Sequence, residues 1–167
     1  MANPMYGQNK LDNQIDNSNG KIVHFTPASD GTAVADAESL VLTAADAGNY
    51  YFLNIGENTC SVKLPSAVLS KGAIFTFIMD VNSDAEGSKD FILFTNAATE
   101  YLMGACYDGA GVHDQPSDDD FIQIDSSDGA VGAGDRVQVL CDGNHWYILE
   151  GSALTAGAWN TGTATRA

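Results

Sequence analysis

Acidic side chains are the residues of this chain whose type and spacing come closest to a chemical site. Asp118, Asp119 and Asp120 stand in succession, and residues 80–86 alternate acidic or amide side chains with uncharged ones. Oxygen ligands of this kind suit Ca²⁺. The second segment is not an EF-hand loop, because its glycine is residue 87 rather than the sixth position and Phe91 occupies the twelfth. We therefore predict no metal site, and a looser calcium site at Asp118, Asp119 and Asp120 remains the alternative to a solvated acidic loop.

Cysteine and histidine side chains could bind zinc only if the fold brought distant residues together. Cys106 and His113 match no common structural-zinc spacing, although Cys141 and His145 flank one turn, which is an arrangement that can bring two side chains together. The chain has three cysteines without paired spacing, so a disulfide framework is not indicated. We expect Cys60, Cys106 and Cys141 to be buried, reduced thiols, as free cysteines usually are.

Sequence motifs for covalent or nucleotide chemistry are absent. There is no G-x-S-x-G elbow, and Gly129, Gly132 and Gly134 lack the strand-to-helix setting of a dinucleotide or phosphate loop. Glycoside hydrolysis stays open because carboxylates are plentiful, but no pair of them is singled out. We predict that the protein is not an enzyme and has neither catalytic residues nor a cofactor.

Aromatic side chains offer a further kind of site, a face that binds sugars. The candidates are Tyr50, Tyr51, Trp146, Tyr147 and Trp159. Aromatic residues within strands more often belong to the core, and we favour that interpretation.

Short apolar runs separated by turn signals must position any such site. The clearest is GDRVQVLCDGNHWYILEG, residues 134–151, in which two strands flank the turn Asp142-Gly143-Asn144. Asp-Gly is a strong hairpin signal because glycine tolerates positive φ. The other runs are SLVLT, NYYFLN, SVKLP, AIFTFIMDV, FILFT and FIQID. Many short strands with turns between them predict the all-β class, a single-domain β-sandwich or barrel that is jelly-roll-like.

Several runs carry apolar side chains on both faces. In residues 74–79, Phe75, Phe77 and Met79 alternate with Ile74, Thr76 and Ile78. Such strands are either covered on both sides within the domain or pack one face against another subunit. The polar segments 80–90 and 104–120 are predicted to be surface loops.

The negative net charge of the chain limits the classes of molecule that it can bind. The formal net charge is -15, and no Lys or Arg lies between Lys89 and Arg136. This balance excludes direct binding to nucleic acid and to anionic membranes, because both carry the same sign of charge. The sequence shows neither a signal peptide nor an apolar run long enough to cross a membrane, so we expect synthesis and folding in a cytoplasm.

The chain divides into three parts. Residues 1–20 are rich in Asn, Gln, Asp and Gly and predict an extended polar N-terminal arm, with a disordered terminus as the alternative. Residues 21–158 form the all-β domain and residues 159–167 a C-terminal tail. Trp159 has no obvious strand cover in that tail, and we predict that it anchors into a neighbouring subunit.

The order of the segments resembles a module of bacteriophage virion proteins. TAADAGNYYFLN is followed by a short strand closed by LP, then by KGAIFTFIMDV, and finally by GDRVQVLCDGNHWYILEG. The resemblance covers roughly residues 40–158 and is to capsid decoration (cement) proteins and tail-associated structural proteins. It implies a decoration protein that assembles as a homotrimer and binds the major capsid protein on the outer surface of the virion head, after synthesis in the host bacterial cytoplasm.

Two further expectations depend on this resemblance. The predicted contacts with neighbouring proteins are Tyr6, Asn9, Leu11 and Ile15 in the arm, together with Trp159. The alternative function is a tail or fibre module that binds a host receptor or glycan.

Overall fold

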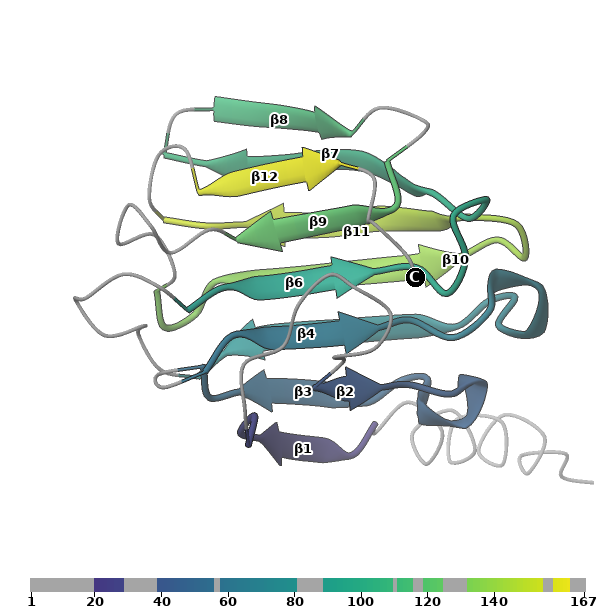
Figure 1. Cartoon of the computed structure of the whole chain (residues 1–167), viewed down its shortest axis with the longest axis horizontal. Coiled ribbons are helices and arrows are strands. Elements are labelled where there is room, and N and C mark those ends of the chain that lie inside the picture. Colours follow the sequence, from purple (N-terminus) through teal and green to yellow (C-terminus); the bar gives the residue numbers. More distant parts are fainter. Residues whose placement is uncertain are drawn as a thin grey trace, which may run out of the picture.

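The computed structural model of the chain describes residues 20–28, 39–55, 58–80, 89–109, 111–115, 119–124, 132–154 and 158–162 (Figure 1). These residues form two β-sheets that lie one over the other. The strand axes of the two sheets are nearly aligned, and each sheet contains parallel and antiparallel pairs. Within them, no helix is long and apolar enough to cross a membrane. The predicted all-β sandwich is confirmed.

The larger sheet has seven strands among the described residues. In spatial order they are β1 (Ile22–Phe25), β3 (Tyr50–Leu53), β5 (Ile74–Met79), β10 (Arg136–Cys141), β11 (Trp146–Ser152), β7 (Leu102–Asp108) and β8 (Gly111–Gln115). The described part of the smaller sheet has five, namely β12 (Trp159–Gly162), β9 (Phe121–Ile124), β6 (Phe91–Phe94), β4 (Cys60–Lys63) and β2 (Leu40–Val41). Two 3-10 turns, η1 (Ala44–Asp46) and η2 (Ala67–Leu69), join strands of different sheets.

The first six strands alternate between the two sheets. In the larger sheet β1, β3 and β5 are parallel neighbours, and in the smaller sheet β2, β4 and β6 are parallel neighbours. Each parallel crossover, which in other folds often contains a helix, therefore contains a strand of the opposite sheet. A jelly roll is built of antiparallel pairs, so the strand order departs from the jelly-roll-like arrangement that the sequence suggested.

The core lies between the sheets and follows the predicted alternation. In β5 the side chains of Phe75, Phe77 and Met79 are fully buried while Ile74 points outward. The smaller sheet contributes Phe91, Leu93, Ile122, Ile124 and Trp159 to the same cluster. Because aromatic rings supply much of this buried area, they account for a large share of the hydrophobic stabilisation.

The closing hairpin is formed by β10 and β11, as predicted. Gly143 has φ +102°, which a side chain would disfavour, and Asp142 Oδ1 accepts hydrogen bonds from the N–H groups of Asn144 and His145 at 2.7 and 2.8 Å. Trp146 and Ile148 face the core, where Trp146 lies opposite Cys141 and Ile148 opposite Val139. A bulge between Gln138 and Val139 shifts the register of the part of the hairpin that is farther from the turn.

Two parts of the chain differ from the sequence expectation. Residues 104–120 were predicted to be a surface loop, but they contain most of β7 and all of β8. The predicted tail begins with β12, which pairs antiparallel with β9, so the sandwich extends to Gly162. β8 was missed because it contains few large apolar residues, and β7 and β12 were missed because their pairing with β11 and β9 has no local sequence signal.

The buried carboxylate of Asp135 joins two chain segments and gives a prediction about pH. Its two oxygens accept hydrogen bonds from the N–H groups of Gly132 and Leu154 at 2.8 and 3.1 Å, and burial raises its pKa above 3.8. The folded chain therefore holds this proton to higher pH than the unfolded chain. We expect the free energy of unfolding of the native chain, relative to Asp135→Asn, to fall as the pH rises through the raised pKa.

Denaturant titrations of both proteins between about pH 2 and pH 8 measure this difference, a range that brackets ordinary carboxyl pKa values. Asp142→Asn serves as the control with the opposite sign, because the N–H groups of His145 and Asn144 lower the pKa of Asp142. Relative to that variant the native chain loses stability as the pH falls. A difference for Asp135→Asn that stays constant with pH would contradict the prediction.

Candidate functional site

The outward surface of the larger sheet is the candidate functional site, and we call it the outer face. It consists of the side chains that alternate with the core residues along β1, β3, β5, β10, β11 and the start of β7. They are Ile22, His24, Tyr50, Phe52, Ile74, Thr76, Ile78, Met103, Arg136, Gln138, Leu140, Tyr147, Leu149 and Glu150. Outward positions of a sandwich strand are usually polar, whereas most of these are apolar.

The strand register places four apolar side chains in one row across the outer face, at the end of the strands beside the β10–β11 turn. Ile74 lies opposite Leu140, Leu140 opposite Tyr147, and Tyr147 opposite Met103. Ile74 and Tyr147 are each 37% exposed, and Leu149, beside the row in β11, is 51% exposed. Apolar side chains that continue across four strands form a patch, which is a different feature from scattered surface residues.

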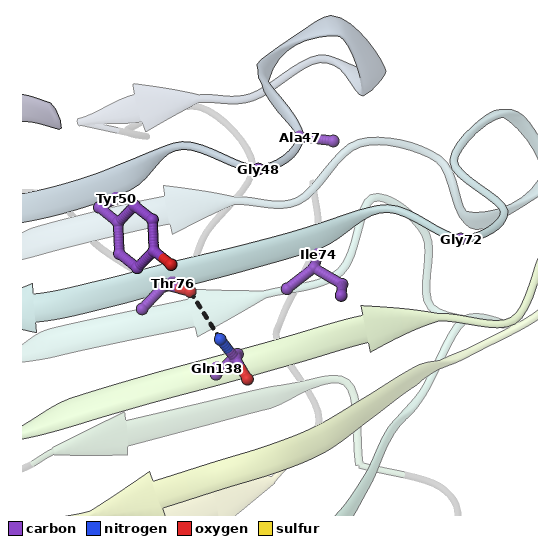
Figure 2. Close-up of a pocket in the computed structure, with 7 residues that line it drawn as sticks. All are labelled: Ala47, Gly48, Tyr50, Gly72, Ile74, Thr76 and Gln138. Carbon is purple, nitrogen blue, oxygen red and sulfur yellow. Dashed lines mark hydrogen bonds between the residues drawn. The ribbon is translucent and has the colours of Figure 1, made fainter. Parts of the chain in front are cut away.

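A second row is partly polar and contains a shallow depression. Tyr50, Thr76 and Gln138 lie opposite one another in β3, β5 and β10. Gln138 Nε2 donates a hydrogen bond to Thr76 Oγ1 at 2.9 Å, and Figure 2 shows the ring of Tyr50 beside this pair. The depression, of about 390 Å³, is completed by Ala47, Gly48, Gly72 and Ile74.

The outer face carries few charges. Arg136 forms an ion pair with Glu150, and His24 Nδ1 lies 3.5 Å from Asp80 Oδ2 at the end of β5. Exposed ion pairs of this kind contribute little to stability. Their importance is that the face carries no acidic excess, although the whole chain has a formal net charge of -15.

No protein-family model matches this chain, and no curated protein matches it in sequence.

The structure describes one of the sequence-predicted contact residues, Trp159. Tyr6, Asn9, Leu11 and Ile15 lie outside the described residues. Trp159 is 3% exposed and packs in the core, where its Nε1 donates to the carbonyl oxygen of Tyr107 at 3.0 Å. The prediction that Trp159 anchors into a neighbour assumed that it had no strand cover, and that assumption is wrong.

The candidate sugar-binding aromatics separate into two groups. Tyr51, Trp146 and Trp159 are buried between the sheets, as the core interpretation predicted. Tyr50 and Tyr147 lie on the outer face. Thr76 and Gln138 were not expected from the sequence to lie beside Tyr50, because the parallel pairing of β3 with β5 has no local sequence signal.

The candidate calcium ligands that the structure describes do not lie in a solvated loop. Asp118 lies outside the described residues, whereas Asp119 and Asp120 are both buried. Asp119 Oδ2 has no hydrogen-bond partner among the described residues. In the described part of the chain no three His, Cys, Asp or Glu side chains form a group that could hold a metal ion.

The cysteines are buried free thiols, as predicted. Burial raises the pKa of Cys60 and of Cys106 to about 12, and it also raises the pKa of Cys141. Thiols with such pKa values stay protonated at neutral pH, and the protonated form is neither a good nucleophile nor a zinc ligand.

Proposed function

We propose that this chain is a bacteriophage decoration protein, which binds the shell of the major capsid protein on the outside of the virion head and stabilises it. The observation that carries the proposal is the outer face, a broad apolar surface with balanced charge on a strongly acidic chain. Exposed apolar patches of this kind are typical of proteins that assemble with other proteins. The order of the sequence segments resembles that of phage virion modules. This resemblance is the reason for proposing that the assembly is a phage virion.

Such a protein acts mechanically. It adds buried area between the units of the shell, and no turnover is required. The acidic remainder of the surface keeps the protein soluble and away from nucleic acid, since like charges repel. Synthesis in the bacterial cytoplasm agrees with cysteines that remain reduced.

We assign contact with the capsid to the N-terminal arm, residues 1–20. The arm joins the sandwich at β1, the edge strand of the larger sheet, where the Tyr50 N–H donates to the carbonyl oxygen of Lys21 at 3.0 Å. A segment attached at an edge can reach another protein without disturbing the core. Its apolar side chains, Tyr6, Leu11 and Ile15, would supply the contacts, and Asn9 a hydrogen bond.

Deletion of residues 1–19 should therefore weaken binding to undecorated shells and leave the domain intact. We expect the dissociation constant to rise on the order of tenfold or more, which corresponds to about 1.4 kcal/mol of lost binding energy. The melting temperature should stay nearly unchanged, because the arm lies outside the described core. Co-sedimentation with capsids that lack the protein measures the first effect and calorimetry the second. Unchanged binding would contradict the role of the arm, and no binding by the full chain would contradict the function.

The second candidate function is a tail or fibre module that binds a host glycan. The depression on the outer face favours it, because an exposed tyrosine ring beside an amide and a hydroxyl is suited to stacking on a sugar and hydrogen bonding to it. Electron microscopy of virions labelled with an antibody against this chain separates the two functions. Label on the head supports decoration, and label confined to the tail supports the glycan-binding module.

A further inference from the structure

We propose that the outer face is the surface on which copies of this chain pack against one another, so that the larger sheets meet around the symmetry axis of the oligomer. The inference deepens the proposed function, since it rests on the chain being an assembly protein and names the surface and the partner. The partner is a second copy of the same chain.

The composition of the outer face supports burial. The row of Ile74, Leu140, Tyr147 and Met103 crosses four of its strands, and Leu149 adds to it. When two sheets pack face to face about 10 Å apart, side chains of this kind interdigitate as they do in the core of a sandwich. The outer face therefore has the apolar side chains that each of two packed sheets needs.

Two of the polar side chains of the face already have a partner within the chain. Gln138 Nε2 already donates to Thr76 Oγ1 within the chain. Arg136 is paired with Glu150 toward the other end of β10 from the apolar row. Since a buried polar group is costly only when it lacks a partner, these contacts lower the cost of covering the face.

Charge indicates that the partner is another copy. Two copies that each carry a formal net charge of -15 repel one another unless they meet on surfaces without acidic excess. On the outer face, Arg136 balances Glu150 and His24 faces Asp80. A basic partner would find little to bind on this face, whereas an identical face matches it in polarity and in charge. Contact between identical chains is also the commonest form of protein oligomer.

Light scattering on purified full-length proteins tests the proposal. The wild-type chain should have the mass of an oligomer at micromolar concentration. Ile74→Asp places a charge in the apolar row of Ile74, Leu140, Tyr147 and Met103. This variant should therefore have the mass of a monomer. Val41→Asp is the matched control, because Val41 is an exposed apolar residue, 58% exposed, on the smaller sheet. It should leave the oligomer mass unchanged.

Cysteine cross-linking provides a second measurement that does not depend on Ile74→Asp folding. Tyr147→Cys places a thiol on the outer face, and the native cysteines do not compete because they are buried. A short bismaleimide should join Tyr147→Cys chains to one another and leave Val41→Cys chains uncross-linked. A wild-type monomer overturns the proposal, as does an oligomer whose Tyr147→Cys chains do not cross-link.

The results of the light-scattering and cross-linking experiments can be distinguished from the result of the capsid-binding experiment. An oligomer that fails to bind shells overturns the proposed function and supports the outer face as a contact between copies. A monomer that binds shells, and loses that binding on Ile74→Asp, overturns the present inference and assigns the outer face to the capsid protein.

Discussion

Replacing Trp146 with alanine should lower the free energy of unfolding by about 3–5 kcal/mol, the range observed for large aromatic side chains removed from a core. The ring is fully buried and packs at a tilt against Phe75, with 5.7 Å between the ring centroids. Its Nε1 has no hydrogen-bond partner among the described residues, so the substitution removes packing and leaves no acceptor behind. A loss of this size is a large share of the stability of a single domain.

Tyr147→Ala is the matched control for this prediction. Tyr147 is the next residue in the same strand, but it points to the outer face and is 37% exposed. Urea denaturation, performed at a protein concentration at which both variants are monomeric, should show a small change for Tyr147→Ala and the full loss for Trp146→Ala. Equal losses would mean that the register of β11 is wrong.

The closing hairpin shows what could be predicted from sequence. Asp142-Gly143 between two alternating runs predicted the turn, the positive φ of Gly143 and the burial of Trp146, and all three are confirmed. The alternation of Phe75, Phe77 and Met79 with their outward neighbours was also predicted correctly. These features are local, since a period of two residues and a turn dipeptide require no knowledge of distant partners.

Strand partners could not be predicted in the same way. β8 has little apolar content of its own and is placed by pairing with β7, while β7 in turn pairs in parallel with β11, more than forty residues later in the chain. The same reason explains why Trp159 was placed in a tail. Its cover comes from β9 and from the carbonyl oxygen of Tyr107, which no local pattern indicates.

The sequence indicated that an apolar outward face exists, but it did not indicate which residues meet on that face. Apolar residues on both faces of residues 74–79 indicated that the outward side would be covered or would meet another subunit. The row that joins Ile74 to Leu140 and Tyr147 exists only because β5, β10 and β11 are neighbours in one sheet. Asp119 and Asp120 show the opposite error, because a polar sequence was taken as solvated and the fold buries both residues.

Gly104 in β7 should tolerate a side chain poorly. Its φ is +126°, which L-residues rarely adopt, and a Cβ atom there would lie 2.9 Å from the carbonyl oxygen of Ile148 and 3.2 Å from the Ile148 Cβ. Because the oxygen belongs to the backbone of the neighbouring strand, it cannot move aside without shifting the β7–β11 pairing. Strain of about 1–3 kcal/mol adds to an overpacking cost of similar size, about 1–3 kcal/mol. We therefore expect Gly104→Ala to lower the free energy of unfolding on the order of 2–5 kcal/mol.

Two further glycines separate the causes of that loss. Gly111 has φ +137° and open space around its Cα, so Gly111→Ala measures conformational strain without a clash. Gly151 is not at positive φ, but its Cβ would lie 2.8 Å from Cys106 Sγ, so Gly151→Ala measures a clash without that strain. Urea denaturation should place Gly104→Ala below both controls in stability, because only Gly104 combines the two effects. If Gly104→Ala proved as stable as Gly111→Ala, the close contact between β7 and β11 would not exist, and the seven-stranded sheet that presents the outer face would need a different strand register.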